Sequence, residues 1–274
     1  MLAYRHGYHA ANHADVLKHS VWLYVLEYMK RKEKPFLVVD THAGPADYDL
    51  ESDFARKNEE HREGLERVLH ADAPPAPIAR YLEAIAAHRQ RYGATRYPGS
   101  FALTLAARRA QDRAVAFELH PSDFAALGDF CRGHRNVAKL QDDGLKGLLA
   151  HVPPVERRAA VIIDPSYEIK TDYQRVPQAL RKACRKFPSG TYVLWYPVVE
   201  RAVTESMLSE LRSVRNVLRL ELAVAPDSKA PGMTASGLAI VNPPFTLAQD
   251  GETIVGWLAQ SLGAKPRVEW WSPE

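Results

Sequence analysis

The sequence of 274 residues has no apolar run approaching the ~20 residues that a membrane-spanning helix requires, so we expect no membrane span. Its first residues lack an apolar core followed by small residues, which argues against a secretory signal peptide. Cysteine is scarce, and Cys131 and Cys184 are too far apart to fit a metal or redox spacing. We therefore expect two free thiols in a protein of the reducing cytoplasm.

Glycine-rich phosphate-binding patterns and a strong charge of one sign are also missing. No Gly-x-Gly-x-x-Gly follows the first strand-like run, which argues against a dinucleotide-dependent dehydrogenase. The net charge of +3 is too small to indicate nucleic-acid binding by itself. Arginine and lysine gather in short clusters, which suit either phosphate contacts or solvated helix ends.

Short apolar runs alternate with helical stretches, which predicts a doubly wound α/β fold with a buried, mostly parallel sheet. Turn-forming residues alone separate the last two runs, so we expect an antiparallel hairpin at the sheet edge. Seven strands ending in such a hairpin resemble the Rossmann-like sheet of class I methyltransferases. The expected strands are residues 36–40, 114–118, 136–140, 159–164, 191–195, 217–224 and 237–241.

Two helical regions depart from this alternation within an expected single domain of residues 1–274. The first two strands are much farther apart than the ~30 residues of a whole βαβ unit. The excess, residues 48–92, has helical patterns at 53–70 and 77–91 and is expected to be an inserted helical subdomain. The segment 1–34, with a helical pattern from residue 9 to 30, is expected to cover the cofactor and substrate cleft.

Ligands of an open α/β sheet bind beyond the carboxyl ends of its strands, so the residues that end each strand are informative. The first strand ends at Asp40, in a turn through Gly44 that can bring backbone N–H groups to a ligand. Glu118, after the second strand, can accept hydrogen bonds from two ribose hydroxyls. After the third strand, Asp143 can accept one from an adenine amino group, with Gly144 allowing close approach; an Asx turn that begins a helix is an equal interpretation.

The most specific motif is Asp164-Pro165-Ser166-Tyr167, after the fourth strand. Amino-methyltransferases carry Asp, Asn or Ser, two prolines and an aromatic residue at this place. The lone pair of an exocyclic base nitrogen is delocalised, so it is a weak nucleophile. The Asp164 side chain and the Pro165 carbonyl can accept its two hydrogens and orient it towards a methyl sulfonium. Tyr167 can stack on an extruded base, and Ser166 replaces the usual second proline without removing these groups.

A second tetrapeptide, Asn242-Pro243-Pro244-Phe245, matches the same pattern more closely. It follows the seventh strand, whereas the catalytic tetrapeptide belongs after the fourth, beside the cofactor cleft. We therefore expect that its prolines end an edge strand.

The N-terminal segment is rich in histidine. His6, His9, His13 and His19 are close enough in sequence to ligate zinc, to face a cofactor or simply to pack. No cysteine and no His-Glu-x-x-His arrangement supports zinc, so we expect no metal.

Together, these motifs resemble those of the RlmJ family of bacterial 23S rRNA adenine-N6 methyltransferases, over essentially the whole chain. The matching segments are Tyr4-Arg5-His6, residues 9–19, residues 40–44, residues 118–121, residues 164–168, residues 194–197 and residues 232–237. The resemblance implies S-adenosyl-L-methionine as cofactor, S-adenosyl-L-homocysteine as product and no metal. It also implies that a monomer modifies one adenine, number 2030, of naked or early-assembly 23S ribosomal RNA.

The resemblance also assigns roles by position. It implies cofactor contacts for His19, His42, Ser100, Glu118, Asp143 and Gly144. It implies that Asp164 is catalytic, that Tyr4 touches RNA and that Lys18 is a further RNA or active-site contact. Independently, Ser100 opens a helical pattern after Gly99, so it can cap that helix and face the cofactor.

Two alternatives stay open at the level of sequence. A DNA adenine methyltransferase would use the same chemistry, although no target-recognition domain is evident. An RNA-binding protein with an impaired site is suggested by Ser166.

Overall fold

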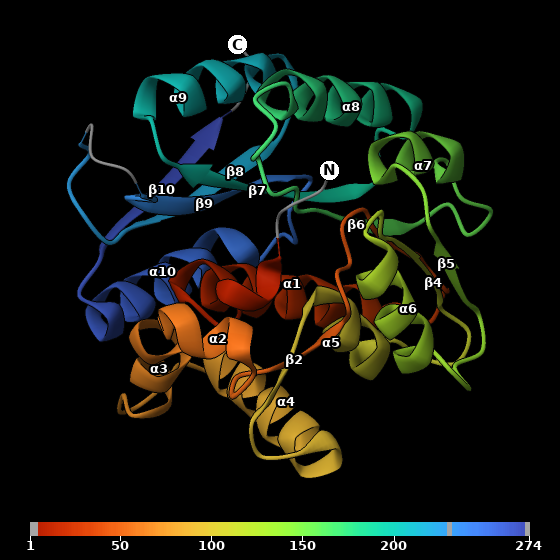
Figure 1. The fold of residues 1–274 in the computed structure, drawn as a ribbon. Coiled ribbons are helices and arrows are strands. Elements are labelled where there is room, and N and C mark those ends of the chain that lie inside the picture. Colours follow the sequence, from red (N-terminus) through yellow and green to blue (C-terminus); the bar gives the residue numbers. More distant parts are fainter. Residues whose placement is uncertain (1–4, 229–231, 272–274) are drawn as a thin grey trace.

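A computed structural model of the protein describes residues 5–228 and 232–271. These residues form an eight-stranded sheet with helices on both faces and a separate two-stranded ladder (Figure 1). In order across the sheet, the strands are β10 (Lys265–Trp271), β8 (Val217–Ala223), β9 (Ala235–Val241), β7 (Thr191–Val198), β6 (Ala159–Ile163), β1 (Leu37–Asp40), β4 (Arg113–Phe117) and β5 (Val137–Leu140).

The parallel half of the sheet consists of β7, β6, β1, β4 and β5. Every residue of β1, β6 and β7 is buried, as expected for strands covered on both faces. β9 runs antiparallel between β7 and β8 and pairs with both. The predicted α/β class is confirmed, including the antiparallel pairing of the sixth and seventh predicted strands.

The predicted count of seven strands is wrong, because β10 joins the sheet beside β8. It pairs antiparallel with β8 from Lys265, opposite Ala223, to Trp271, opposite Val217. The β8–β9 hairpin therefore lies inside the sheet and not at its edge. Most side chains of β10 are exposed, so its sequence has no apolar run, and its proline is tolerated on an edge strand.

Helices cover the two faces unequally. α1, α5 and α10 pack on one face, and α8 and α9 lie on the other, with α7 beside α8 (Figure 1). α1 is buried on almost every side because it lies against the sheet, α4, α5 and α10. These helices are α1 (His13–Lys30), α4 (Ala76–Tyr92), α5 (Ser100–Ala107), α6 (Pro121–Phe130), α7 (Gly144–His151), α8 (Asp172–Lys186), α9 (Arg201–Ser209) and α10 (Leu247–Leu262). In the part of the chain described, no helix is long and apolar enough to cross a membrane.

The N-terminal helix begins at His13, later than the predicted residue 9. A short 3-10 helix, η1 (His6–Tyr8), comes first, and Ala11 then turns the chain with a left-handed φ of 63°. The Asn12 side chain caps α1 by accepting hydrogen bonds from the N–H groups of Ala14 and Asp15. The turn therefore separates η1 from α1.

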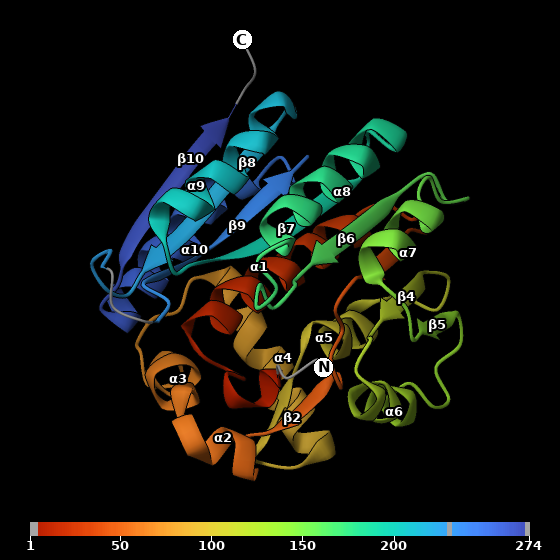
Figure 2. The same ribbon diagram turned by 45° about the horizontal axis from the view of Figure 1, so that its top comes forward.

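The segment between β1 and β4 folds mainly into helices, which lie beside η1 and α1, away from α8 and α9 (Figure 2). Its base is an antiparallel ladder of β2 (Asp47–Asp49) and β3 (Arg96–Pro98), which the sequence did not reveal. The first predicted helix is broken, because Glu59 adopts a left-handed φ of 50°. Its pieces are α2 (Asp53–Asn58), the π-helix η2 (Arg62–Glu66) and α3 (Arg67–Leu69). The second predicted helix follows after a loop as α4.

Candidate active site

A cavity of about 700 Å³ opens at the carboxyl ends of the parallel strands, and residues of the N-terminal segment from His6 to His19 contribute to its lining. All ten candidate site residues that the structure describes line this cavity. They are Lys18, His19, His42, Ser100, Glu118, Asp143, Gly144, Asp164, Pro165 and Tyr167. Tyr4 lies outside the described residues.

Glu118 follows β4 and supports the turn after β1. Its carboxylate accepts hydrogen bonds from the N–H groups of Gly44, at 3.0 Å, and of His120, at 2.6 Å. Burial raises the pKa of Glu118, and the bond from His120 opposes that shift. Each carboxylate oxygen can accept a second hydrogen bond, so the side chain can also bind two ribose hydroxyls.

Asp143 caps α7, so the Asx-turn interpretation describes one of its two oxygens. Oδ1 accepts hydrogen bonds from the N–H groups of Leu145, at 2.9 Å, and Lys146, at 3.3 Å. Oδ2 accepts one from Arg175 on α8, at 2.6 Å, a partner that the sequence did not suggest. Burial raises the pKa of Asp143, but Lys146 and Arg175 lower it below its usual value overall. The residue therefore presents an anionic acceptor to the cavity.

Gly144 brings two strand-end loops into contact. A Cβ atom at this position would lie 1.9 Å from the carbonyl oxygen of Thr41, which is backbone and cannot rotate away. The glycine therefore lets the start of α7 touch the turn after β1, and both segments line the cavity.

Two histidines of the cavity, the buried His19 and the partly buried His42, stay neutral near pH 7. Burial lowers the pKa of His42 to about 4 and that of His19 to about 3. His19 Nδ1 lies 2.7 Å from the hydroxyl of Tyr97, and His42 Nδ1 lies 2.8 Å from that of Thr41. Both rings can therefore donate or accept hydrogen bonds without bringing a charge into the cleft.

The sequence predicts that Ser100 caps α5, and the structure shows that it does not. Gly99 already has the extended backbone of an N-cap, so Ser100 is the first helical residue. Its hydroxyl donates a hydrogen bond to Asp40 Oδ2 at 2.6 Å instead. Burial raises the pKa of Asp40 to about 7, although the bond from Ser100 opposes this shift. Ser100 thus joins α5 to the end of β1 at the cavity.

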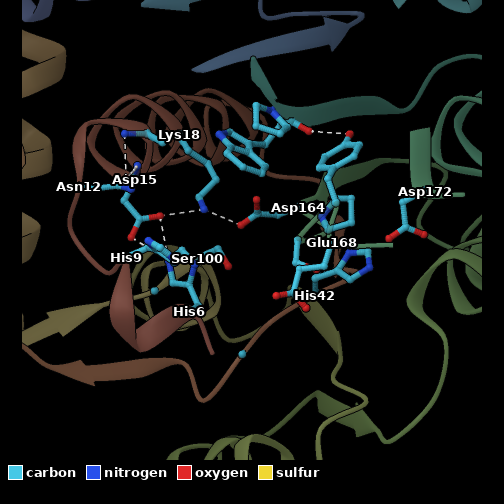
Figure 3. Close-up of a pocket in the computed structure, with 18 of the residues that line it drawn as sticks. His6, His9, Asn12, Asp15, Lys18, His42, Ser100, Asp164, Glu168 and Asp172 are labelled. Atoms are coloured by element: carbon cyan, nitrogen blue, oxygen red, sulfur yellow. Dashed lines mark hydrogen bonds and ion pairs between the residues drawn. The ribbon is translucent and has the colours of Figure 1, made fainter. Parts of the chain in front are cut away.

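Asp164 follows β6 and forms a buried ion pair with Lys18, whose Nζ lies 2.5 Å from Asp164 Oδ2 (Figure 3). The Lys18 side chain is 2% exposed, and its Nζ also lies 2.8 Å from Asp15 Oδ1. Burial disfavours the charge, but the two carboxylates raise the pKa of Lys18 above its usual value. Because its ammonium is covered, Lys18 is placed for a role inside the active site and not for a phosphate on the protein surface.

Tyr167 forms part of an aromatic wall beside Asp164. It has a left-handed φ of 56°, and its hydroxyl donates a hydrogen bond to the carbonyl of Trp195 at 3.1 Å. Its ring centre lies 4.8 Å from that of Tyr173 and 6.0 Å from that of Trp195. All three residues line the cavity. They form a side wall against which a flat base can pack.

The second tetrapeptide, Asn242 to Phe245, lies near the amino ends of the parallel strands, away from the cleft, because β9 runs antiparallel to them. Asn242 Nδ2 donates hydrogen bonds to the carbonyls of Pro188, at 2.7 Å, and Gly190, at 2.8 Å, near the start of β7. Phe245 is 89% exposed. The residues from Asn242 to Phe245 are absent from the described cavity lining, and the strand that they end is an interior one.

Two of the N-terminal histidines, His6 and His9, pair with carboxylates. His6 Nε2 lies 2.9 Å from Asp15, and His9 Nδ1 lies 2.8 Å from Glu60 of the insertion. Within residues 5–228 and 232–271, no group of three or more His, Cys, Asp or Glu side chains is arranged to hold a metal ion.

Glu118 and Asp143 present carboxylate oxygens to the cavity, of the kind that can accept hydrogen bonds from ribose hydroxyls or an amino group. Gly144 lets the start of α7 approach the turn after β1 closely. With an antiparallel strand inserted beside the last parallel one, this site and sheet define a class I methyltransferase fold, whose methyl donor is S-adenosyl-L-methionine. A family model described as "Ribosomal RNA large subunit methyltransferase D, RlmJ" matches residues 33–272. The chain belongs to this family.

Relatives match the chain along its whole length. Two proteins named Ribosomal RNA large subunit methyltransferase J, from Escherichia coli and Haemophilus influenzae, are each 42% identical to it, with 100% of both chains covered. A crystal structure of a Legionella pneumophila protein has a TM-score of 0.88 and 34% identity, over 96% of this chain and 99% of that one. The family resemblance seen in the sequence is confirmed.

The Glu118 carboxylate should make cofactor binding depend on pH. We expect Glu118→Gln to weaken S-adenosyl-L-methionine about tenfold, since an amide is a poorer acceptor than a carboxylate by ~1.4 kcal/mol. Because the pKa of Glu118 is raised, wild-type affinity should fall as pH decreases, starting at a higher pH than for an ordinary glutamate. Titration calorimetry between pH 5 and 8 measures this.

Other titratable groups of the site limit what else can contribute to this pH dependence. His19 and His42 have lowered pKa values and stay neutral over this range, and Asp143 stays ionised. Asp40, with a pKa of about 7, titrates in both proteins, so Glu118→Gln should keep the pH dependence due to Asp40 and lose only the part due to Glu118. Equal pH dependence in both proteins would rule out Glu118 as the titrating group.

Proposed function

We propose that this protein transfers the methyl group of S-adenosyl-L-methionine to the exocyclic N6 of one adenine in 23S ribosomal RNA, adenine 2030. The observation that carries the proposal is the position of Asp164 and Pro165 at the end of β6, in one cavity with Glu118 and Asp143. Ribosomal RNA is supported by the full-length likeness to proteins named large subunit methyltransferase J.

The geometry suggests how the chain activates the amine. Lys18 occupies Asp164 Oδ2, which leaves Oδ1 to accept one N6 hydrogen, while the Pro165 carbonyl accepts the other. These bonds draw electron density onto N6 and fix its orientation. The bound cofactor supplies a methyl group on a positively charged sulfur. In this proposal Asp164 Oδ1 also accepts the proton that N6 loses.

The aromatic wall suggests how the base is held. An adenine inside a helix cannot reach a cavity beneath the N-terminal segment, so the target has to be extruded from its stack. Tyr167 and Trp195 then pack against the base, and Tyr4 is proposed to contact the RNA from the N-terminal segment. We propose that the enzyme acts as a monomer on protein-free or early-assembly rRNA in the cytoplasm.

Three methyl acceptors test this function. Purified protein with labelled S-adenosyl-L-methionine should methylate a protein-free 23S rRNA transcript, and mass spectrometry should place one N6-methyladenine at position 2030. Assembled large subunits should accept far less label, and plasmid DNA none. Label in DNA and not in RNA would refute the RNA assignment. Cofactor binding without label in any acceptor would refute catalysis.

A further inference from the structure

We propose that Asp15, on α1, is a positioning residue for methyl transfer, which holds Lys18 against Asp164 and ties the N-terminal segment to that ion pair. The inference rests on the proposed function, because it concerns the geometry of the same site. Neither the strand-end motifs nor the tetrapeptide pattern pointed to this residue.

Asp15 is the most heavily hydrogen-bonded acid of the site. It is fully buried, and its two oxygens accept from His6 Nε2 at 2.9 and 3.1 Å, from the Ala11 N–H at 2.9 Å and from Lys18 Nζ at 2.8 Å. His19 Nε2 lies 3.9 Å away. Burial raises the pKa of Asp15, but His6 and Lys18 lower it well below its usual value. The carboxylate therefore stays ionised in a place where an unpaired charge would be costly.

The charge of Asp15 matters to the proposed reaction because Asp15 contacts Lys18, which in turn contacts Asp164. Its buried ammonium lies between two carboxylates, one from α1 and one from the end of β6 (Figure 3). Without Asp15, Asp164 would be the one described carboxylate left in contact with the ammonium, so Lys18 and Asp164 could move together. Asp164 would then lose the fixed orientation of its second oxygen, the one proposed to accept the N6 hydrogen.

The other partners of Asp15 belong to the N-terminal segment. His6 lies in η1, and Ala11 has the left-handed backbone that turns the chain into α1. The insertion fixes this turn from outside, because the Leu65 N–H donates a hydrogen bond to the Ala11 carbonyl at 3.0 Å. A Cβ on Gly64 would lie 2.3 Å from the same oxygen, so the two segments are in close contact. Asp15 thus connects the turn at Ala11, which the insertion holds, to Lys18 and through Lys18 to Asp164.

A double-mutant cycle tests whether Asp15 acts through Lys18. Asp15→Asn, which is isosteric but neutral, should lower kcat on 23S rRNA about 10²-fold, the usual cost of misplacing a catalytic group by ~1 Å. The KM values for RNA and cofactor should change less than about threefold, since neither ligand is expected to contact Asp15. In a Lys18→Met background, Asp15→Asn should lower kcat by less than about threefold, because the group that it positions is already gone.

Asp112 provides the matched control. It is also a fully buried aspartate, but it binds Arg109 and the Phe36 N–H at the amino end of β1, away from the cleft. Asp112→Asn should lower the melting temperature and leave kcat unchanged. If Asp15→Asn did not fold, Asp15→Glu, which moves the charge by one methylene, would take its place in the same cycle.

The outcomes separate this proposal from the proposed function. A folded Asp15 variant with wild-type kcat, or equal losses with and without Lys18, would overturn the role of Asp15 while leaving the enzyme assignment intact. A wild-type protein that methylates no rRNA would overturn the function itself.

Discussion

Replacing Asp164 with alanine is expected to lower kcat for methyl transfer about 10³-fold, the scale of losing one acid–base or charge-stabilising group. The substitution removes the proposed acceptor of one N6 hydrogen and one of the two carboxylates that hold Lys18. Cofactor affinity should stay within about threefold, because the groups proposed to hold the cofactor lie on α1 and α5, after β1 and β4, and at the start of α7, and do not include Asp164. Single-turnover assays on 23S rRNA and calorimetry with S-adenosyl-L-methionine measure the two effects separately.

Asn242→Ala is the matched control, since it alters the tetrapeptide that fits the sequence pattern better. The side chain holds two backbone carbonyls and sits at a left-handed φ of 50°. Its loss should cost ~1–3 kcal/mol of folding free energy and leave kcat unchanged. An Asp164→Ala protein with wild-type kcat, or an Asn242→Ala protein that is folded and inactive, would reverse the choice between the two motifs.

Gly144→Ala is expected to weaken S-adenosyl-L-methionine about 30-fold and to lower the melting temperature. The new Cβ would overlap the Thr41 carbonyl, so the start of α7 and the turn after β1 must separate. Overpacking of this kind costs ~1–3 kcal/mol, and ~2 kcal/mol corresponds to about 30-fold in Kd. Calorimetry and thermal unfolding with and without the cofactor measure both effects.

Gly256→Ala distinguishes this clash from a general effect of adding a methyl group. Gly256 lies inside α10, and a Cβ there would meet no described atom within 4 Å. The variant should gain up to ~1 kcal/mol of stability, as alanine does over glycine inside a helix, with cofactor affinity unchanged. Full cofactor affinity in Gly144→Ala would show that the two loops can separate without harm to the site.

The parallel half of the fold was predictable because its strands carry continuous apolar runs. β1, β6 and β7 are buried on both faces, so their residues are almost all apolar and stand out in the sequence. β10 was not predictable, because it is held by pairing with β8 and most of its side chains are exposed. The β2–β3 ladder is three residues long on each side, too short for periodicity to reveal.

The site was predictable where a residue follows a strand, and less so elsewhere. Glu118, Asp143 and Asp164 follow three parallel strands of the sheet, β4, β5 and β6, so topology brings them to the same end of the strands. Arg175 lies on α8, and its contact with Asp143 depends on how that helix packs. Asp15 and Lys18 lie on the same helix, but the contact of Lys18 with Asp164 depends on how α1 packs against the end of β6. A polar residue in a helix gives no sign of what it faces, although an acid three residues before a lysine, as in α1, is a signal for an ion pair.

The reversed direction of β9 has a practical consequence for handling the enzyme. The strand spans seven residues, about 20 Å at ~3.3 Å per residue, so its carboxyl end lies about one strand length away from the cleft. The exposed Phe245 follows that end. A fluorophore or surface linker attached there would leave the cleft open to a large RNA, which suits single-molecule measurements of binding and release.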